Sequence, residues 1–191
     1  AGKAVCMVTY GHPGVFALPT HIAIRKARHE GFEAAMYPAV SAADCLYADL
    51  GVDPATGSVS YEATDFLRRR LVIDPTTSII LWQIGVVGQT IYRKQATLPP
   101  PALSLLVDKL TTKHKFPADH KCVDAEAAPL PGFEPLKAQV TLQDLPSSSR
   151  VTANSTLYVP PAKKTRYDRE MEKKLGEIAP QGAGKPNKPT K

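Results

Sequence analysis

The sequence predicts an α/β protein, and three observations indicate that class. An almost continuously apolar run at residues 4–9 precedes a glycine-containing loop and a helical pattern. A second such run, at 32–37, precedes another helical pattern, and a third lies at 78–85. Strands that are buried on both faces have unbroken apolar sequences, and strands that alternate with helices are typical of α/β folds.

The first strand, loop and helix form the unit around which we organise the chain. We expect a strand at 4–9, the loop Tyr10–Phe16, and a helix from His21 to Glu30 with Thr20 as its N-cap and Gly31 just beyond its end. Two glycines in the loop permit a sharp turn and close approach of the backbone to a ligand. Open α/β sheets bind ligands at the carboxyl ends of their strands. The loop is therefore predicted to form part of a cofactor site.

The next unit predicts a strand at 32–37 and a helix that ends near Leu50. Ser41 is suited to cap that helix, and Asp44 stands at N3, where a carboxylate meets the positive end of the helix dipole. The elements expected from there to residue 78 are a turn at 51–57, a helix at 61–68 and a connection at 71–77.

The second half of the chain begins with the apolar strand at 78–85. Gln83 is a polar residue within that strand, and a buried amide needs hydrogen-bond partners in the protein or in a ligand. The elements expected further on are a helix at 101–113, strands at 121–125, 136–142 and 154–161, a polar helix at 167–176 and a disordered end at 179–191.

The composition argues against several classes of protein. Of the net charge of +6, residues 163–191 carry +5, from nine basic and four acidic residues. A solubilising basic end is therefore favoured over a polyanion-binding arm, and nucleic acid is not an expected partner. No apolar run approaches the roughly 20 residues of a membrane span, and the start has no signal-peptide pattern. Three dispersed cysteines indicate a reduced, cytoplasmic protein without a metal site.

The loop at 10–16 matches none of the common ligand or nucleophile motifs. It lacks the dinucleotide fingerprint, the phosphate-binding loop and the nucleophile elbow. His12 can act as a general base, contact a ligand or stabilise the loop; the latter two are favoured because no nearby carboxylate is evident to orient it. Tyr10 either packs at the end of the strand or holds its phenol over the site.

Five segments, in this order, resemble the tetrapyrrole (corrin/porphyrin) methylase family, over about residues 3–161. They are 10–16 (YGHPGVF), 27–31 (ARHEG), 40–44 (VSAAD), 61–65 (YEATD) and 82–85 (WQIG). Members that act on tetrapyrroles have Gly-Asp-Pro or Gly-Glu-Pro in the loop, whereas this chain has Gly11-His12-Pro13. That difference favours the branch of borosin-type peptide backbone N-methyltransferases.

The resemblance implies a two-domain α/β enzyme, with a mostly parallel sheet in the first domain and a mixed sheet in the second. The corresponding divisions are 1–70, a linker at 71–78, 79–161, a polar helix within 162–178 and a basic tail at 179–191. S-adenosylmethionine is expected between the domains. The residues expected to contact it are Tyr10, His12, Val15, Phe16, Ser41, Ala42, Gln83, Ser155 and Thr156.

Several of these residues also have a structural interpretation. Val15 and Phe16 can belong to a core, and Ser41 can serve only as a helix cap. Tyr10 is the candidate catalytic residue, because it supplies the phenol of the motif loop. The resemblance also implies that the family's first strands, with a catalytic tyrosine and arginine, precede residue 1.

The predicted function is methyl transfer from S-adenosylmethionine to backbone amide nitrogens of a peptide. The peptide is expected to come from another chain, because residues 180–191 contain no apolar core peptide. The alternatives are a tetrapyrrole or another small molecule as the acceptor, or a non-catalytic binding domain. The resemblance further implies a homodimer.

Overall fold

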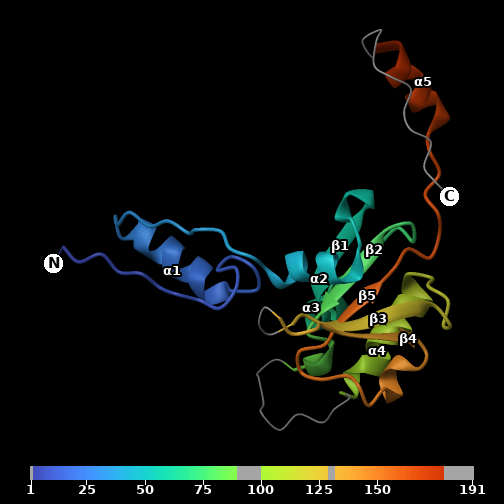
Figure 1. Ribbon diagram of the computed structural model, residues 1–191, viewed down its shortest axis with the longest axis horizontal. Helices are drawn as coiled ribbons and strands as arrows, with labels where there is room; N and C mark the ends of the chain where they lie inside the picture. The colour runs from blue at the N-terminus through green and yellow to red at the C-terminus, as the bar shows by residue number, and fades with distance from the viewer. Residues whose placement is uncertain (1, 90–99, 129–131, 179–191) are drawn as a thin grey trace.

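A five-stranded mixed sheet lies at the centre of the computed structural model, which describes residues 2–89, 100–128 and 132–178 (Figure 1). Its order is β1-β2-β5-β3-β4. β1 runs parallel to β2, and the other neighbouring strands are antiparallel. The strand bounds are β1 Ser58–Glu62, β2 Ser78–Trp82, β3 Lys121–Glu126, β4 Leu136–Thr141 and β5 Thr156–Val159.

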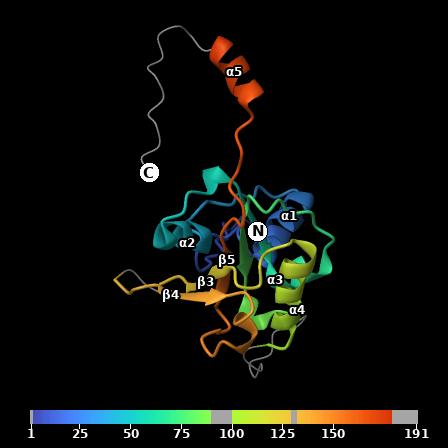
Figure 2. The same ribbon diagram turned by 90° about the vertical axis from the view of Figure 1, so that its right-hand side faces the viewer.

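Strand β2 is buried along its whole length and divides the core into two layers. Ile79 and Leu81 point to the face covered by α4 (Ala102–Asp108), which continues as a π-helical turn over Lys109–Lys113. The alternate residues, Ile80 and Trp82, pack on the opposite face with Leu46 of α2 (Ala42–Leu50). Figure 2 shows these two helices on opposite sides of the sheet. The unbroken apolar sequence of β2 follows from this two-sided burial.

Strands β2 to β5 and helices α2 and α4 lie where the sequence predicted elements of the same kind. Strand β1 was missed, because its sequence alternates polar residues and follows a glycine turn. It ends where Glu62 caps α3 (Ala63–Arg68), its carboxylate accepting the N–H groups of Thr64 and Asp65 at 2.9 and 2.7 Å. β1 and β2 flank residues 71–78 and pair in one sheet, and the division into two domains stays a prediction.

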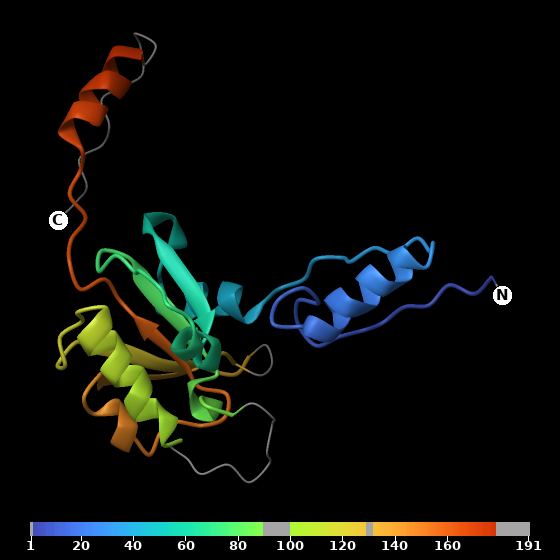
Figure 3. The ribbon, with the colours of Figure 1, turned by 180° about the vertical axis from the view of Figure 1, so that it is seen from behind.

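The N-terminal arm, which we define as residues 2–40, projects away from the sheet (Figures 1 and 3). The prediction of buried strands at 4–9 and 32–37 is wrong. Both segments lack β-ladder pairing, and the side chain of Val5 is 92% exposed. An apolar extended segment becomes a strand only where a neighbouring strand supplies the hydrogen bonds. The sequence pattern cannot reveal whether that neighbour is present.

The arm's helix α1 spans Leu18–His29, so it begins three residues before the expected His21. Ala17, not the predicted Thr20, occupies its N-cap position, without a side-chain cap. Thr20 lies in its first turn, where the hydroxyl donates to the carbonyl of Ala17 at 2.6 Å. Gly31 follows the helix with φ of 84°, the left-handed conformation expected after a helix end.

The last described helix, α5 (Arg169–Ile178), stands apart from the sheet (Figure 2) and matches the polar helix predicted at 167–176. The disorder predicted for 179–191 concerns residues outside the described ranges. Over those ranges, the search for a helix with the length and hydropathy of a membrane span finds none. The same ranges contain no cluster of three or more His, Cys, Asp or Glu that could bind a metal ion.

His114 gives the core a predicted pH dependence. It is buried against the ring of Phe66 at 5.4 Å between centroids, and its Nε2 has no hydrogen-bond partner in the part of the chain that the structure describes. Burial, and then the charge of Lys109, lower the pKa of His114 below its ordinary 6.5. The folded state therefore binds fewer protons than the unfolded state, so the free energy of unfolding should fall as pH drops through 6.5, by up to about 1.4 kcal/mol per pH unit.

Urea unfolding at pH values between 5 and 8 measures this effect, in a range above the ordinary carboxyl pKa values. A His114→Phe variant should lose that part of the pH dependence, whereas His29→Gln, at an exposed position, should retain it. The same slope in His114→Phe as in the unmodified chain would contradict the assignment.

Candidate cofactor site at the end of strand β2

The chain turns sharply at the end of β2. Gln83 has φ of 60° and ψ of 38°, and a 3-10 turn at Ile84–Val86 follows. The prediction that Gln83 lies inside the strand is wrong: its left-handed backbone ends the strand at Trp82, and its side chain is exposed. The amide therefore faces the surface beside the strand end, where a ligand can reach it.

This turn rests directly on the loop that precedes β5. The N–H of Ile84 donates to the carbonyl of Ser155 at 3.0 Å. Gly85 lies so close to the same loop that a Cβ on it would fall 1.6 Å from the carbonyl oxygen of Thr152. The structure thus brings the predicted residues Gln83 and Ser155 onto adjoining segments.

Ser155 and Thr156 are both buried. The hydroxyl of Ser155 accepts the N–H of Thr152 at 3.0 Å, so its observed role is to shape the loop. Thr156 opens β5, opposite Ala125 of β3. Neither hydroxyl lies on an open surface, and their predicted contact with adenosine stays untested.

The loop at 10–16 is closed by its own hydrogen bonds. His12 Nδ1 accepts the N–H of Gly14 at 2.9 Å, and the carbonyl of His12 accepts the N–H of Val15 at 3.2 Å. His21 Nε2 pairs with the carbonyl of Gly14 at 2.8 Å, and the hydroxyl of Thr20 donates to Pro13. The ring of His12 therefore stabilises the turn, one of the roles that the sequence left open.

Phe16 joins this loop to the end of β2. Its ring lies 5.5 Å from that of Trp82, between centroids, at an interplanar angle of 58°. Phe16 and Gln83 are two of the three non-glycine residues with positive φ in the described ranges. Strained backbone of this kind clusters at ligand sites. Two such residues on either side of one aromatic contact make this the strongest candidate for a binding region.

Ser41 is the N-cap of α2 and Asp44 stands at N3, as the sequence predicted, and their hydrogen bonds form a reciprocal cap. The N–H and the hydroxyl of Ser41 each donate to the carboxylate of Asp44 at 2.7 Å. These bonds lower the pKa of Asp44, with a smaller contribution from the charge of His12. Sequence reasoning found no carboxylate near His12. The tertiary structure brings the carboxylate of Asp44 near His12. From the sequence, the N3 position of Asp44 indicated only a role at the start of the helix.

The remaining predicted residues are more open. Tyr10 is 90% exposed, and Val15 and Ala42 are also exposed. Trp82 was noted in the sequence only as part of a motif; its role emerges from its contact with Phe16 and from the indole N–H that donates to Ser60. The surface beside Trp82 thus combines aromatic rings, the Gln83 amide and backbone polar groups. Such rings can pack against the aromatic part of an adenosyl group, and the amide and backbone groups can form hydrogen bonds with its polar part.

The comparison with protein families matches residues 1–81 to the Tetrapyrrole (Corrin/Porphyrin) Methylases. A protein of Coprinopsis marcescibilis named methyltransferase/ribosomally synthesized type I borosin cyclic peptide precursor is 40% identical over 92% of this chain and 46% of its own length. A gymnopeptide precursor with methyltransferase from Gymnopus fusipes is 42% identical, over 84% of this chain and 38% of its own. The chain spans about half the length of the curated relatives it matches.

Among solved structures, the methyltransferase CobJ superposes with a TM-score of 0.53 at 16% identity, over 83% of this chain and 64% of that one. A match of that identity is informative about the fold alone, and the fold is α/β as predicted. The sequence relatives match almost the whole chain, and the family comparison matches residues 1–81, which hold the loop at 10–16 and the cap of α2. The chain therefore belongs to the tetrapyrrole methylase family of S-adenosylmethionine-dependent methyltransferases.

Proposed function

We propose that this protein methylates backbone amide nitrogens of a peptide supplied by another chain, with S-adenosylmethionine as the methyl donor. The observation that carries the proposal is the 40% identity, over 92% of the chain, to a protein named as a methyltransferase and borosin cyclic peptide precursor. The loop sequence Gly11-His12-Pro13 supports the same branch. The names of such relatives join enzyme and peptide precursor in one protein, so the experiment must separate the two arrangements.

We propose that the cofactor contacts the surface around the Phe16–Trp82 pair. Phe16 and Val15 would cover its apolar parts, and the Gln83 amide would orient its polar groups. When bound, S-adenosylmethionine supplies an electrophilic methyl group. The hydrogen bonds of His12 hold the loop in one conformation, so that the loop loses less conformational entropy when the cofactor binds.

The chemical difficulty lies with the acceptor. An amide nitrogen is a poor nucleophile, because its lone pair is delocalised into the carbonyl. Its proton has to leave as the N–C bond forms and the donor's S–C bond breaks. A tyrosine phenolate within reach can accept that proton. We propose Tyr10 for this role, since its side chain projects from the cofactor loop. Positioning the amide and excluding water supply the rest of the acceleration.

The test incubates the complete protein with S-adenosylmethionine and synthetic peptides, followed by tandem mass spectrometry. We expect peptides to gain methyl units on backbone nitrogens. A matched peptide, with an ester in place of the methylated amide, should gain none at that position, because it has no nitrogen there. Methyl groups found only on the protein's own chain would contradict supply in trans. Methylation of a tetrapyrrole, with all peptides unchanged, would overturn the proposed substrate.

We further propose that the protein is a cytoplasmic homodimer, divided into domains near residues 71–78. The cytoplasmic assignment is supported by three free cysteines, one of them exposed. Light scattering of the complete protein measures its mass in solution; a monomer at micromolar concentration would contradict the dimer.

A further inference from the structure

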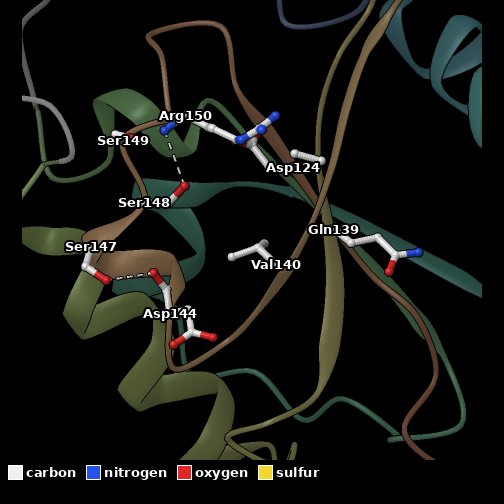
Figure 4. A pocket seen from close by; sticks show the side chains of 9 residues that line it. Asp124, Gln139, Val140, Asp144, Ser147, Ser148, Ser149 and Arg150 are labelled. Carbon is white, nitrogen blue, oxygen red and sulfur yellow. Dashed lines mark hydrogen bonds between the residues drawn. The ribbon is translucent and has the colours of Figure 1, made fainter.

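A polar pocket lies on the α4 side of the sheet, away from the Phe16–Trp82 contact. Its volume is about 330 Å³, and it is bounded by the middle of β4 and the segment at 144–150. Figure 4 shows Asp124 and Arg150 at one end, Asp144 and Ser147 at the other, and Val140 between them. None of the nine residues predicted to bind the cofactor lines it. The pocket therefore requires an explanation separate from methyl transfer.

Asp124 is the unusual group in this pocket. It belongs to strand β3 and is only 6% exposed, yet its Oδ1 has no hydrogen-bond partner among the described residues. Burial raises the pKa of Asp124, and the nearby Glu126 adds to this, whereas Ser155 and Arg150 act in the opposite direction. A buried carboxylate oxygen without a partner is costly and rare in folded proteins. Because Asp124 lines the pocket, its unpartnered oxygen indicates a donor that the described residues do not provide.

The charges around the pocket indicate the kind of donor. Two carboxylates, Asp124 and Asp144, line it, and a third, Glu126, is close enough to affect Asp124. Arg150 is the one cation in the lining. It is exposed, and none of the ion pairs within 4 Å among the described residues joins it to Asp124. The hydroxyls of Ser147, Ser148 and Ser149 add further acceptors. The balance of charge therefore favours a cation that carries N–H groups.

We propose that this pocket binds a primary ammonium group, with the carboxylate of Asp124 as its acceptor. The pocket is large enough for a short alkylammonium chain, which Val140 and Ala138 would contact. Asp144 and the serine hydroxyls accept the remaining N–H bonds or those of bridging water. The same chemistry is presented by a free amine and by a lysine side chain of a peptide. This site does not depend on the proposed methyltransferase function.

Titration calorimetry on the complete protein tests the site with n-butylammonium chloride, and with n-butanol as the neutral match. A blocked peptide with a single lysine forms the second arm, and the tighter ligand identifies the source. We expect n-butylammonium to bind and n-butanol not to bind. Asp124→Asn should weaken the binding of n-butylammonium at least about tenfold, because hydrogen bonds to charged groups are stronger than those between neutral groups. Asp119→Asn, at an exposed aspartate outside the pocket, should bind as the unmodified protein does.

A melting measurement and one further variant distinguish binding from a structural role. Asp124→Asn should melt at the same or a higher temperature, because it removes a buried charge while keeping the shape of the side chain. Arg150→Gln should raise the affinity for n-butylammonium about twofold to fivefold, which is the size of an exposed charge interaction. Early melting of Asp124→Asn, weaker binding in Arg150→Gln, or no binding by the unmodified protein at millimolar n-butylammonium would each overturn the proposal.

Discussion

Replacing Gly85 with alanine is expected to destabilise the protein more than the same substitution at any other described glycine. The new Cβ would lie 1.6 Å from the carbonyl oxygen and 2.4 Å from the carbonyl carbon of Thr152. Backbone atoms cannot rotate away as the end of a side chain can. Either the β2 turn or the loop before β5 has to move, and the Ile84–Ser155 hydrogen bond would then be lost. We expect a loss of about 4 kcal/mol or more in the free energy of unfolding.

Urea unfolding, monitored by circular dichroism, measures this loss, and Gly176→Ala is the matched control. Gly176 lies in α5, where a Cβ would meet nothing within 4 Å, so the same substitution there should stabilise by about 0.5–1 kcal/mol. If Gly85→Ala unfolds at the urea concentration of the unmodified chain, the contact between the β2 turn and the 152–155 loop is not as tight as described here.

Replacing Tyr10 with phenylalanine is expected to lower the rate of peptide methylation about 100-fold to 10,000-fold, the usual contribution of a positioned acid or base. The substitution removes only the phenol oxygen and leaves the ring. Binding of S-adenosylmethionine should therefore change little, while the turnover of a saturating peptide falls. Single-turnover assays on the complete protein separate these two quantities.

Tyr37→Phe provides the control for Tyr10→Phe, because Tyr37 is another exposed tyrosine of the N-terminal arm and lies outside the motif loop. It should retain the unmodified rate. Equal rates for Tyr10→Phe and the unmodified protein would remove Tyr10 from the proposed chemistry. A large loss of cofactor affinity with an unchanged turnover would assign it to binding instead.

The elements that were predicted correctly are those whose signal is local. The cap of α2 needs only a serine and an aspartate three residues apart, and both its bonds are present. Strand β2 is recognisable because burial on both faces leaves an unbroken apolar run from Ile79 to Trp82. Strand β1 gives no such signal, because its residues are only partly buried beside a single partner.

The candidate site depends more strongly on the tertiary structure. The sequence singled out the loop at 10–16 and the segment at 82–85 through a resemblance, but it could not show that the rings of Phe16 and Trp82 meet. It placed Gln83 inside a strand, whereas the left-handed turn there exposes the amide. It offered no carboxylate for His12, and Asp44 is 32 residues further along the chain. Asp124 carried no signal, because a single aspartate in a strand is unremarkable until its burial is known.

The sequence by itself determined the α/β class, the capped helix, the buried strand and the family. Each of these depends on residue types at short, fixed spacing, or on their order along the chain. The tertiary structure alone decided that 4–9 and 32–37 form no β-ladder, that Gly85 rests on Thr152, and that Asp124 lines a pocket. The physical reason is that strand pairing, close backbone approach and burial of a charge are relations between segments far apart in the sequence. Local propensity carries no information about such partners.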